Sequence, residues 1–174
     1  MLKFVFLGAW HGHASMHVKE AAARPEEFEL VGMHDADAEV ISRNQERWKE
    51  HGLEIPLFES VEDLLNSEAA AVVIEGHVYQ NLDYVEQALN AGKHVLSEVI
   101  AATSIADCWD LVAAVEAAGL TYMMDENFCY RRETMMIRNM ADHGVFGEMT
   151  FAEGAYIHDC RRLLFHADGS RTWR

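Results

Sequence analysis

A regular alternation of short apolar runs with segments of helical composition constrains the fold of this chain more than any other feature. The apolar runs predict strands over residues 4–7, 29–33, 55–58, 69–74, 93–97 and 120–124. Helices are predicted between them, over residues 14–24, 38–51, 79–90 and 104–118, and a short one begins after Ser60, its candidate cap. Strands that alternate with helices in this way form a parallel sheet covered on both faces through right-handed crossovers. The sequence therefore predicts a doubly wound α/β domain through about residue 125.

Beyond residue 131 the alternation stops. A helix is predicted over residues 133–143 and a long strand over residues 148–157, whereas residues 161–174 show no clear period. A lone strand leaves an unpaired sheet edge, which tends to recruit a second copy of the chain. We therefore expect a homo-oligomer.

The charge and composition exclude several classes of partner. The 174 residues carry a formal net charge of -15, which argues against nucleic acid or an anionic membrane surface as a partner. No apolar run approaches the roughly 20 residues of a membrane span, and the start of the chain runs into a strand without a signal peptide. Cys108, Cys129 and Cys160 are sparse, odd in number and lack a C-x-x-C spacing, which is typical of reduced, buried thiols. We therefore expect a cytoplasmic protein.

Residues 4–17, FVFLGAWHGHASMH, have the order of a phosphate-binding corner, with a strand, a glycine turn and a helix start. In such a corner, backbone N–H groups and the positive end of the helix dipole face the pyrophosphate of a dinucleotide. The G-x-G-x-x-G pattern would place glycines at positions 8, 10 and 13, whereas this chain has Gly8, Trp10 and His13, with a displaced Gly12. Either Trp10 swings outward over the cofactor, or the loop is shifted so that Gly12 lets the backbone approach the pyrophosphate.

Asp35 ends the second predicted strand, 27 residues after Gly8. An acidic side chain at this place accepts hydrogen bonds from the adenosine ribose hydroxyls and repels the 2′-phosphate of NADP. The predicted cofactor is therefore NAD, with NADP disfavoured. The alternative role of Asp35 is the N-cap of the following helix.

Three histidines lie in and after the corner, at positions 11, 13 and 17. The imidazole N–H groups of His11 and His13 could replace the lost glycine contacts to phosphate or ribose. A metal site is the sharper alternative, but these histidines lack a regular ligand spacing and a nearby carboxylate. We therefore predict no metal site.

Four features together resemble one family: the Gly8 corner, Asp35, the segment AGKHVLSE over residues 91–98, and Asn127 after the last predicted strand. They are similar to the glucose–fructose oxidoreductase / inositol dehydrogenase / MocA superfamily. The resemblance implies that residues 1–125 form a Rossmann dinucleotide-binding domain. It also implies that residues 126–174 are the incomplete start of an α+β substrate or oligomerisation domain. Part of the chain further resembles the NAD-dependent α-N-acetylgalactosaminidase branch, through residues 98–161, including the run Tyr156-Ile157-His158-Asp159.

The resemblance assigns further residues to the cofactor site. Glu98, at the end of the fifth predicted strand, would face the nicotinamide ribose; the alternative is a solvated carboxylate at a strand end. Gly76 and His77 stand where many members of the family have Thr-Pro-Asn beside the nicotinamide. His77 and Asn127 would therefore ring the nicotinamide, or each is an ordinary polar group at a strand end.

The sequence departs from the family at the proton relay. Val99-Ile100 replaces the Lys-Pro of the family's Glu-Lys-Pro, and valine cannot carry a proton. Tyr156 and His158 are two residues apart on a predicted strand, so their side chains share one face. They are candidates for the general base and its orienting partner, or they belong to an amphipathic strand that supports the second domain.

Two functions follow as hypotheses. The first is an NAD(P)-dependent oxidoreductase, or a redox-assisted glycosidase, that acts on a sugar, cyclitol or related polyol. The second is a nucleotide-binding or interaction module without catalysis, because the relay lysine is replaced and the corner glycines are eroded.

Overall fold

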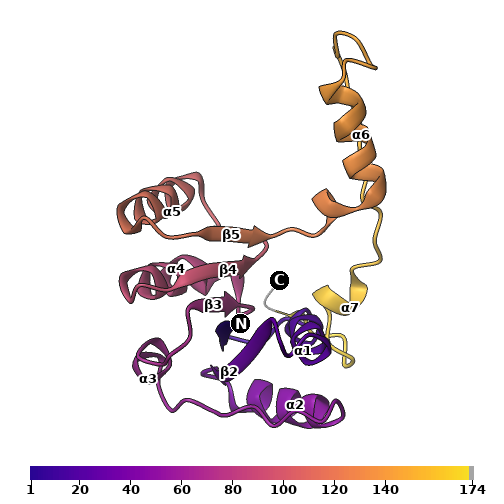
Figure 1. Ribbon diagram of the computed structural model, residues 1–174. Coiled ribbons are helices and arrows are strands. Elements are labelled where there is room, and N and C mark those ends of the chain that lie inside the picture. The colour runs from indigo at the N-terminus through magenta and orange to yellow at the C-terminus, as the bar shows by residue number, and fades with distance from the viewer. Residues whose placement is uncertain (173–174) are drawn as a thin grey trace. The chain divides into compact units, whose positions relative to one another are not determined.

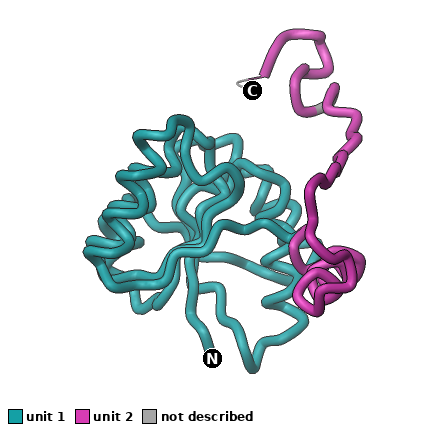
Figure 2. The backbone as a smooth tube through the Cα atoms, turned by 90° about the horizontal axis from the view of Figure 1, so that it is seen from above, with its two compact units in different colours: residues 1–127 teal, residues 128–174 magenta. Residues whose placement is uncertain are grey.

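The computed structural model describes residues 1–172 and consists of two compact units, residues 1–127 and residues 128–174 (Figure 2). The last two residues of the predicted second domain lie outside the described part of the chain.

Unit 1 is built on a five-stranded parallel sheet with the strand order β2-β1-β3-β4-β5 (Figure 1). The strands are β1 (Leu2–Leu7), β2 (Phe28–His34), β3 (Ala71–Ile74), β4 (His94–Glu98) and β5 (Tyr122–Asp125). The chain passes from β1 to β2 on one side and then crosses to β3 on the other side of β1. The carboxyl ends of β1 and β3 therefore flank the switch point, where ligands bind in open parallel sheets. The predicted doubly wound α/β fold is confirmed.

Helices cover both faces of the sheet because the side chains of a strand alternate between its faces. Phe4 and Phe6 of β1 lie in a core with α1 (Ala14–Ala23) and α2 (Ala38–Lys49). Val5 and Leu7 lie in a second core, which includes residues of three further helices: α3 (Val61–Leu65), α4 (Asn81–Asn90) and α5 (Ile105–Ala118). The predicted cap of α3 is confirmed, since the Ser60 hydroxyl accepts a hydrogen bond from the Asp63 N–H at 3.0 Å.

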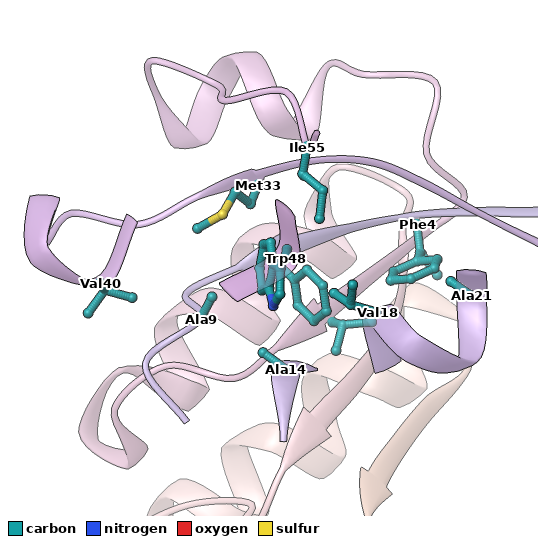
Figure 3. Packing of buried hydrophobic residues seen from close by; sticks show 12 residues of the cluster. Phe4, Ala9, Ala14, Val18, Ala21, Met33, Val40, Trp48 and Ile55 are labelled. Carbon is teal, nitrogen blue, oxygen red and sulfur yellow. The ribbon is translucent and has the colours of Figure 1, made fainter. Parts of the chain in front are cut away.

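Trp48 is at the centre of the first core and is fully buried (Figure 3). Its ring stacks on Phe6 with centroids 5.7 Å apart. Its indole N–H donates to the Ser15 hydroxyl at 3.3 Å, so the polar atom of this large side chain has a partner. The last turn of α2 is thereby fixed against β1 and α1.

The predicted strand over residues 55–58 is wrong. This segment makes one isolated parallel bridge, between Met33 and Leu57, beside the outer edge of β2. Pro56 has no N–H to donate, which limits the pairing. A Cβ at Gly32 would lie 2.6 Å from the Phe58 ring, so the glycine allows the segment to cross close to β2.

Unit 2 contains the short 3-10 helix η2 (Phe128–Tyr130) and two α-helices, α6 (Arg132–Asp142) and α7 (Arg161–Leu164). The helix predicted over residues 133–143 is present, but residues 148–160 contain no strand or helix. A strand exists only where its backbone groups pair with a neighbour, and no described residue pairs with this segment. The unpaired edge that supported a homo-oligomer is therefore not observed.

The three cysteines are exposed and form no disulfide within the described residues, so the prediction of buried thiols is wrong. They lie on the outer side of α5, in η2 and before α7, where no core forms around them. None of the helices in the described residues is both long enough and apolar enough to span a bilayer.

Candidate dinucleotide corner and the acidic edge of the sheet

The loop after β1 meets the loop after β3 at two glycines. Gly8 has a φ of 76°, and a Cβ at this position would lie 2.8 Å from the Cα of Gly76. Backbone hydrogen bonds join the same loops, from the Glu75 N–H to the Gly8 carbonyl at 3.2 Å and from the His11 N–H to the Glu75 carbonyl at 2.8 Å. Gly8 therefore satisfies both a positive φ and a close backbone approach.

Trp10 occupies the place of the second family glycine. Its side chain is half-buried against the core of α1 and α2, and its ring lies 5.1 Å from the ring of His77. The Trp10 carbonyl accepts a hydrogen bond from the Arg43 guanidinium at 2.8 Å. An outward swing of Trp10 is therefore not observed. A Cβ at the displaced Gly12, by contrast, would meet nothing within 4 Å.

Asp35 links the loop after β1 to the end of β2 through hydrogen bonds. One carboxylate oxygen accepts a hydrogen bond from the Ala9 N–H at 2.8 Å, and the other accepts from the Asp37 N–H at 2.9 Å. The N-cap of α2 is Asp37, whose side chain accepts from the Glu39 N–H. The alternative of Asp35 as a helix cap is therefore wrong.

Three histidines of the corner meet three carboxylates at the carboxyl edge of the sheet, and we call these six residues the edge cluster: His11, His13, His17, Glu75, Glu98 and Asp125. In its outer part, His13 Nδ1 lies 2.7 Å and His11 Nδ1 lies 3.4 Å from the same Glu98 oxygen. Glu98 is only 4% exposed, so the alternative of a solvated carboxylate is wrong.

In the inner part of the edge cluster, one imidazole nitrogen faces two carboxylates. His17 Nε2 lies 2.9 Å from Glu75 Oε1 and 2.9 Å from Asp125 Oδ2. The other oxygen of Glu75 lies 3.6 Å from His11 Nδ1, which links the two parts. Glu75 is fully buried, and the imidazoles of His17 and His11 lie beside its carboxylate.

Opposite charges within the edge cluster shift the pKa values of His11, His17 and Glu98. The carboxylates of Glu75 and Glu98 raise the pKa of His11 to about 9, against the smaller effect of burial. Burial lowers the pKa of His17, but Asp125 and Glu75 outweigh it and raise that pKa to about 9. Burial raises the pKa of Glu98, whereas His11 and His13 lower it to about 2 in all. His11 and His17 are thus cationic and Glu98 anionic at neutral pH.

The expectation that no carboxylate lies near these histidines is wrong, because Glu75, Glu98 and Asp125 lie beside them. These carboxylates end or follow three different strands, 58 to 108 residues away from His17, so their closeness to the histidines is not visible in the local sequence. A signal was present in the sequence: Asp35, Glu75, Glu98 and Asp125 each end or directly follow a strand of the parallel sheet. The carboxyl ends of parallel strands meet at one edge of the sheet, so acidic residues at these ends are expected to lie along that edge.

The remaining predicted cofactor residues lie around the same edge. The His77 ring stacks on Tyr79 at 5.2 Å, and burial lowers the His77 pKa. Asn127 is exposed, two residues beyond β5. The Val99–Ile100 peptide, at the place of the family's Lys-Pro, is cis.

The predicted catalytic pair lies in unit 2. The rings of Tyr156 and His158 stack with centroids 5.6 Å apart, and Phe128 meets Tyr156 edge-on at 5.0 Å. The two side chains therefore share one side of the backbone although the predicted strand is absent. The His158 Nδ1 also lies 3.5 Å from the Cys160 sulfur, a pairing that the sequence analysis did not anticipate.

Comparison with known families gives two matches along the chain. Residues 2–126 match the oxidoreductase family with an NAD-binding Rossmann fold. Residues 130–173 match the C-terminal domain of glycosyl hydrolase 109. The two matches divide the chain close to the boundary between the two compact units.

Individual proteins resemble the chain over part of their length. Glycosyl hydrolase family 109 protein 2 of Shewanella sp. (strain ANA-3) is 33% identical over 159 residues, which cover 87% of this chain and 35% of that protein. The alpha-N-acetylgalactosaminidase of Bacteroides fragilis (strain ATCC 25285) is 50% identical over 80 residues, which cover 46% of this chain and 19% of that protein. The chain thus spans about a third of the length of the first of these relatives.

A solved structure with the same fold is scyllo-inositol dehydrogenase from Lactobacillus casei with bound cofactor NAD(H) and scyllo-inositol. It superposes with a TM-score of 0.73 at 20% sequence identity, and the match covers 86% of this chain and 43% of the dehydrogenase. At this identity the likeness shows the fold alone.

Proposed function

The chain belongs to the oxidoreductase family with an NAD-binding Rossmann fold, as its motifs predicted, and on that premise we propose that unit 1 binds NAD at the Gly8 corner. In a protein of the length of its relatives, the cofactor serves hydride transfer to or from a hydroxyl-bearing carbon of a sugar, cyclitol or related polyol. The match to the glycosyl hydrolase 109 C-terminal domain favours cleavage of a glycoside assisted by this redox chemistry.

The observation that carries the proposal is the shape of the corner. Gly8 and Gly76 bring the loops after β1 and β3 together at the switch point of the sheet, where this fold binds its ligands. A Cβ at Gly12 would project into open space, so the backbone there is accessible to a phosphate. The corner therefore fits a dinucleotide even though Trp10 replaces a glycine.

The residues of this corner have separate roles in the proposal. Imidazole N–H groups of His11 and His13 contact the pyrophosphate, in place of the backbone approach that a glycine allows. Asp35 accepts hydrogen bonds from the adenosine ribose and disfavours NADP, whereas Glu98 accepts from the nicotinamide ribose. Two further residues, His77 and Asn127, line the nicotinamide side.

Proton transfer is assigned to unit 2. When bound, NAD supplies the hydride acceptor. Because valine replaces the relay lysine at position 99, another group has to take the proton of the substrate hydroxyl. The stacked rings of Tyr156 and His158 offer a phenol and an imidazole in one place, and we assign them the roles of general base and orienting partner.

Calorimetric titration of the chain with NAD⁺ and with NADP⁺ in matched buffer tests the cofactor site. We expect micromolar binding of NAD⁺ and binding of NADP⁺ that is at least about tenfold weaker, since a like charge beside a phosphate costs several kcal/mol. Asp35→Ser should weaken NAD⁺ binding and reduce the ratio of the NADP⁺ dissociation constant to the NAD⁺ dissociation constant. Glu39→Gln, an exposed change in the first turn of α2, is the matched control and should leave both affinities unchanged.

Two other results of these titrations would contradict the proposal. No heat with either dinucleotide would refute the cofactor corner and favour the interaction module without catalysis. An unchanged NAD⁺ to NADP⁺ ratio in Asp35→Ser would refute the role of that carboxylate alone.

A further inference from the structure

We propose that His17, Glu75 and Asp125 form a binding site for a divalent first-row transition-metal ion. These residues form the inner part of the edge cluster, whereas the outer part, with His11, His13 and Glu98, is assigned to the dinucleotide. The proposal rests on the positions of three ligand atoms and does not depend on cofactor binding.

The separations of the ligand atoms suit one ion. His17 Nε2 lies 2.9 Å from Glu75 Oε1 and 2.9 Å from Asp125 Oδ2, and the three ligand atoms lie within 4.8 Å of one another. Two ligands at right angles around an octahedral ion, each about 2.1 Å from it, are about 3.0 Å apart. The ion would take the place of the proton that Nε2 now shares with the two carboxylates, and that proton would pass to the buffer.

The burial of Glu75 is the second observation. This carboxylate is fully buried, and its oxygen Oε2 accepts no hydrogen bond from any described residue. Oε2 lies 3.6 Å from His11 Nδ1, beyond hydrogen-bond distance. A fully buried carboxylate gains from a directly bound cation, because burial removes the solvation of its charge.

The three ligands are held by separate elements of the rigid sheet domain. His17 lies in the second turn of α1, Glu75 directly follows β3, and Asp125 ends β5. The His17 ring lies 6.3 Å from the ring of the fully buried Phe6, which restrains it from the core side. Asp125 and His17 are each about a fifth exposed, so an ion can reach the site from solvent.

The donor set points to a class of ion. Imidazole favours zinc, iron, copper and nickel, and carboxylates favour manganese and magnesium. One nitrogen with two carboxylates therefore selects a first-row transition ion over Mg²⁺ or Ca²⁺. Three protein ligands also leave positions open for water or for an oxygen of a substrate.

Cobalt is a direct probe because its visible absorption reports coordination by nitrogen and oxygen. Metal-free chain is titrated with CoCl₂, and separately with MnCl₂, ZnCl₂ and MgCl₂ by calorimetry. We expect one equivalent of Co²⁺, Mn²⁺ or Zn²⁺ to bind, an absorption change with Co²⁺, and much weaker binding of Mg²⁺. No binding of any transition ion at millimolar concentration overturns the proposal.

Matched variants locate the ion. Asp125→Asn should weaken Co²⁺ binding by at least about tenfold, a loss that even outer-shell substitutions cause. Asp110→Asn, an exposed change on α5, and His13→Gln, in the outer part of the edge cluster, should leave it unchanged. His17→Gln replaces Asp125→Asn if that variant fails to show a cooperative thermal transition. Co²⁺ binding that survives Asp125→Asn and His17→Gln, or that is lost in His13→Gln alone, overturns the assignment.

Discussion

Two glycines of the same loop have different structural roles. Gly8 combines a φ of 76° with an approach so close that a Cβ would lie 2.8 Å from the Cα of Gly76. Gly12 has neither constraint, since a Cβ there would meet nothing within 4 Å. The first glycine therefore serves the fold, whereas any need for the second comes from a ligand.

Gly8→Ala should lower the free energy of unfolding by about 1–3 kcal/mol, because alanine is strained at positive φ and its methyl group would clash with Gly76. Gly12→Ala should change it by no more than about 0.5 kcal/mol. Urea unfolding followed by circular dichroism measures both. Gly12→Ala should nevertheless weaken NAD⁺ binding if the pyrophosphate approaches this backbone. Equal stability of Gly8→Ala and the native chain would contradict the close contact between Gly8 and Gly76.

At the scale of the elements, β1 joins two cores through the alternation of its side chains. Phe4 and Phe6 face α1 and α2, and Val5 and Leu7 face the other layer of helices. Trp48 closes the first core, because it is fully buried, stacks on Phe6 and donates its N–H to Ser15. Trp48 thereby anchors the end of α2 in the first core.

Trp48→Ala should destabilise unit 1 by about 3–5 kcal/mol, the usual cost of removing a buried aromatic side chain. Trp109→Ala is the matched control, since Trp109 is 69% exposed, and its effect should stay within about 0.5 kcal/mol. Both are measured by urea unfolding with circular dichroism, because each variant loses a fluorophore. Similar losses in the two variants would mean that Trp48 does not anchor α2.

The strands and helices of unit 1, apart from the strand expected over residues 55–58, could be predicted from the sequence because each strand has its own apolar run and each helix its own period. The sequence predicted Asp35 and Glu98 at the sheet edge because they stand at recognisable places beside motifs. Glu75 directly follows the buried strand β3, but it was not singled out, because its partner His17 lies 58 residues away in the sequence. The strand predicted over residues 148–157 is wrong because its alternating pattern says nothing about a pairing partner. A strand forms only where a partner exists.

The whole molecule consists of two units that match two different families. Unit 1 carries the Gly8 corner and the edge cluster, and unit 2 carries Tyr156 and His158. The chain covers about a third of its relative from Shewanella, so the substrate chemistry of these relatives is assigned to it only as a proposal.

Replacing Tyr156 by Phe and His158 by Gln together should reduce turnover by at least about 100-fold, the usual contribution of general acid–base catalysis. NAD⁺ affinity should stay unchanged because neither residue belongs to the cofactor corner. Absorbance of the reduced nicotinamide is followed with scyllo-inositol, and release of p-nitrophenol is followed with p-nitrophenyl α-N-acetylgalactosaminide, because redox-assisted cleavage returns the hydride and leaves no net reduced nicotinamide. The double variant Tyr130→Phe and His143→Gln, exposed residues of unit 2, is the control. Turnover that persists in the first variant and not in the second would refute the assignment.

The edge cluster also limits the order in which the parts of this protein can reach their final structure during synthesis. The contact between His13 and Glu98 spans 85 residues, and the ion pair between His17 and Asp125 spans 108. A ribosome makes the histidines first, but their last carboxylate partner emerges only after more than 100 further residues. Because such distant contacts form late in folding, the first loop and helix to be synthesised reach their final state only when the last strand has joined the sheet.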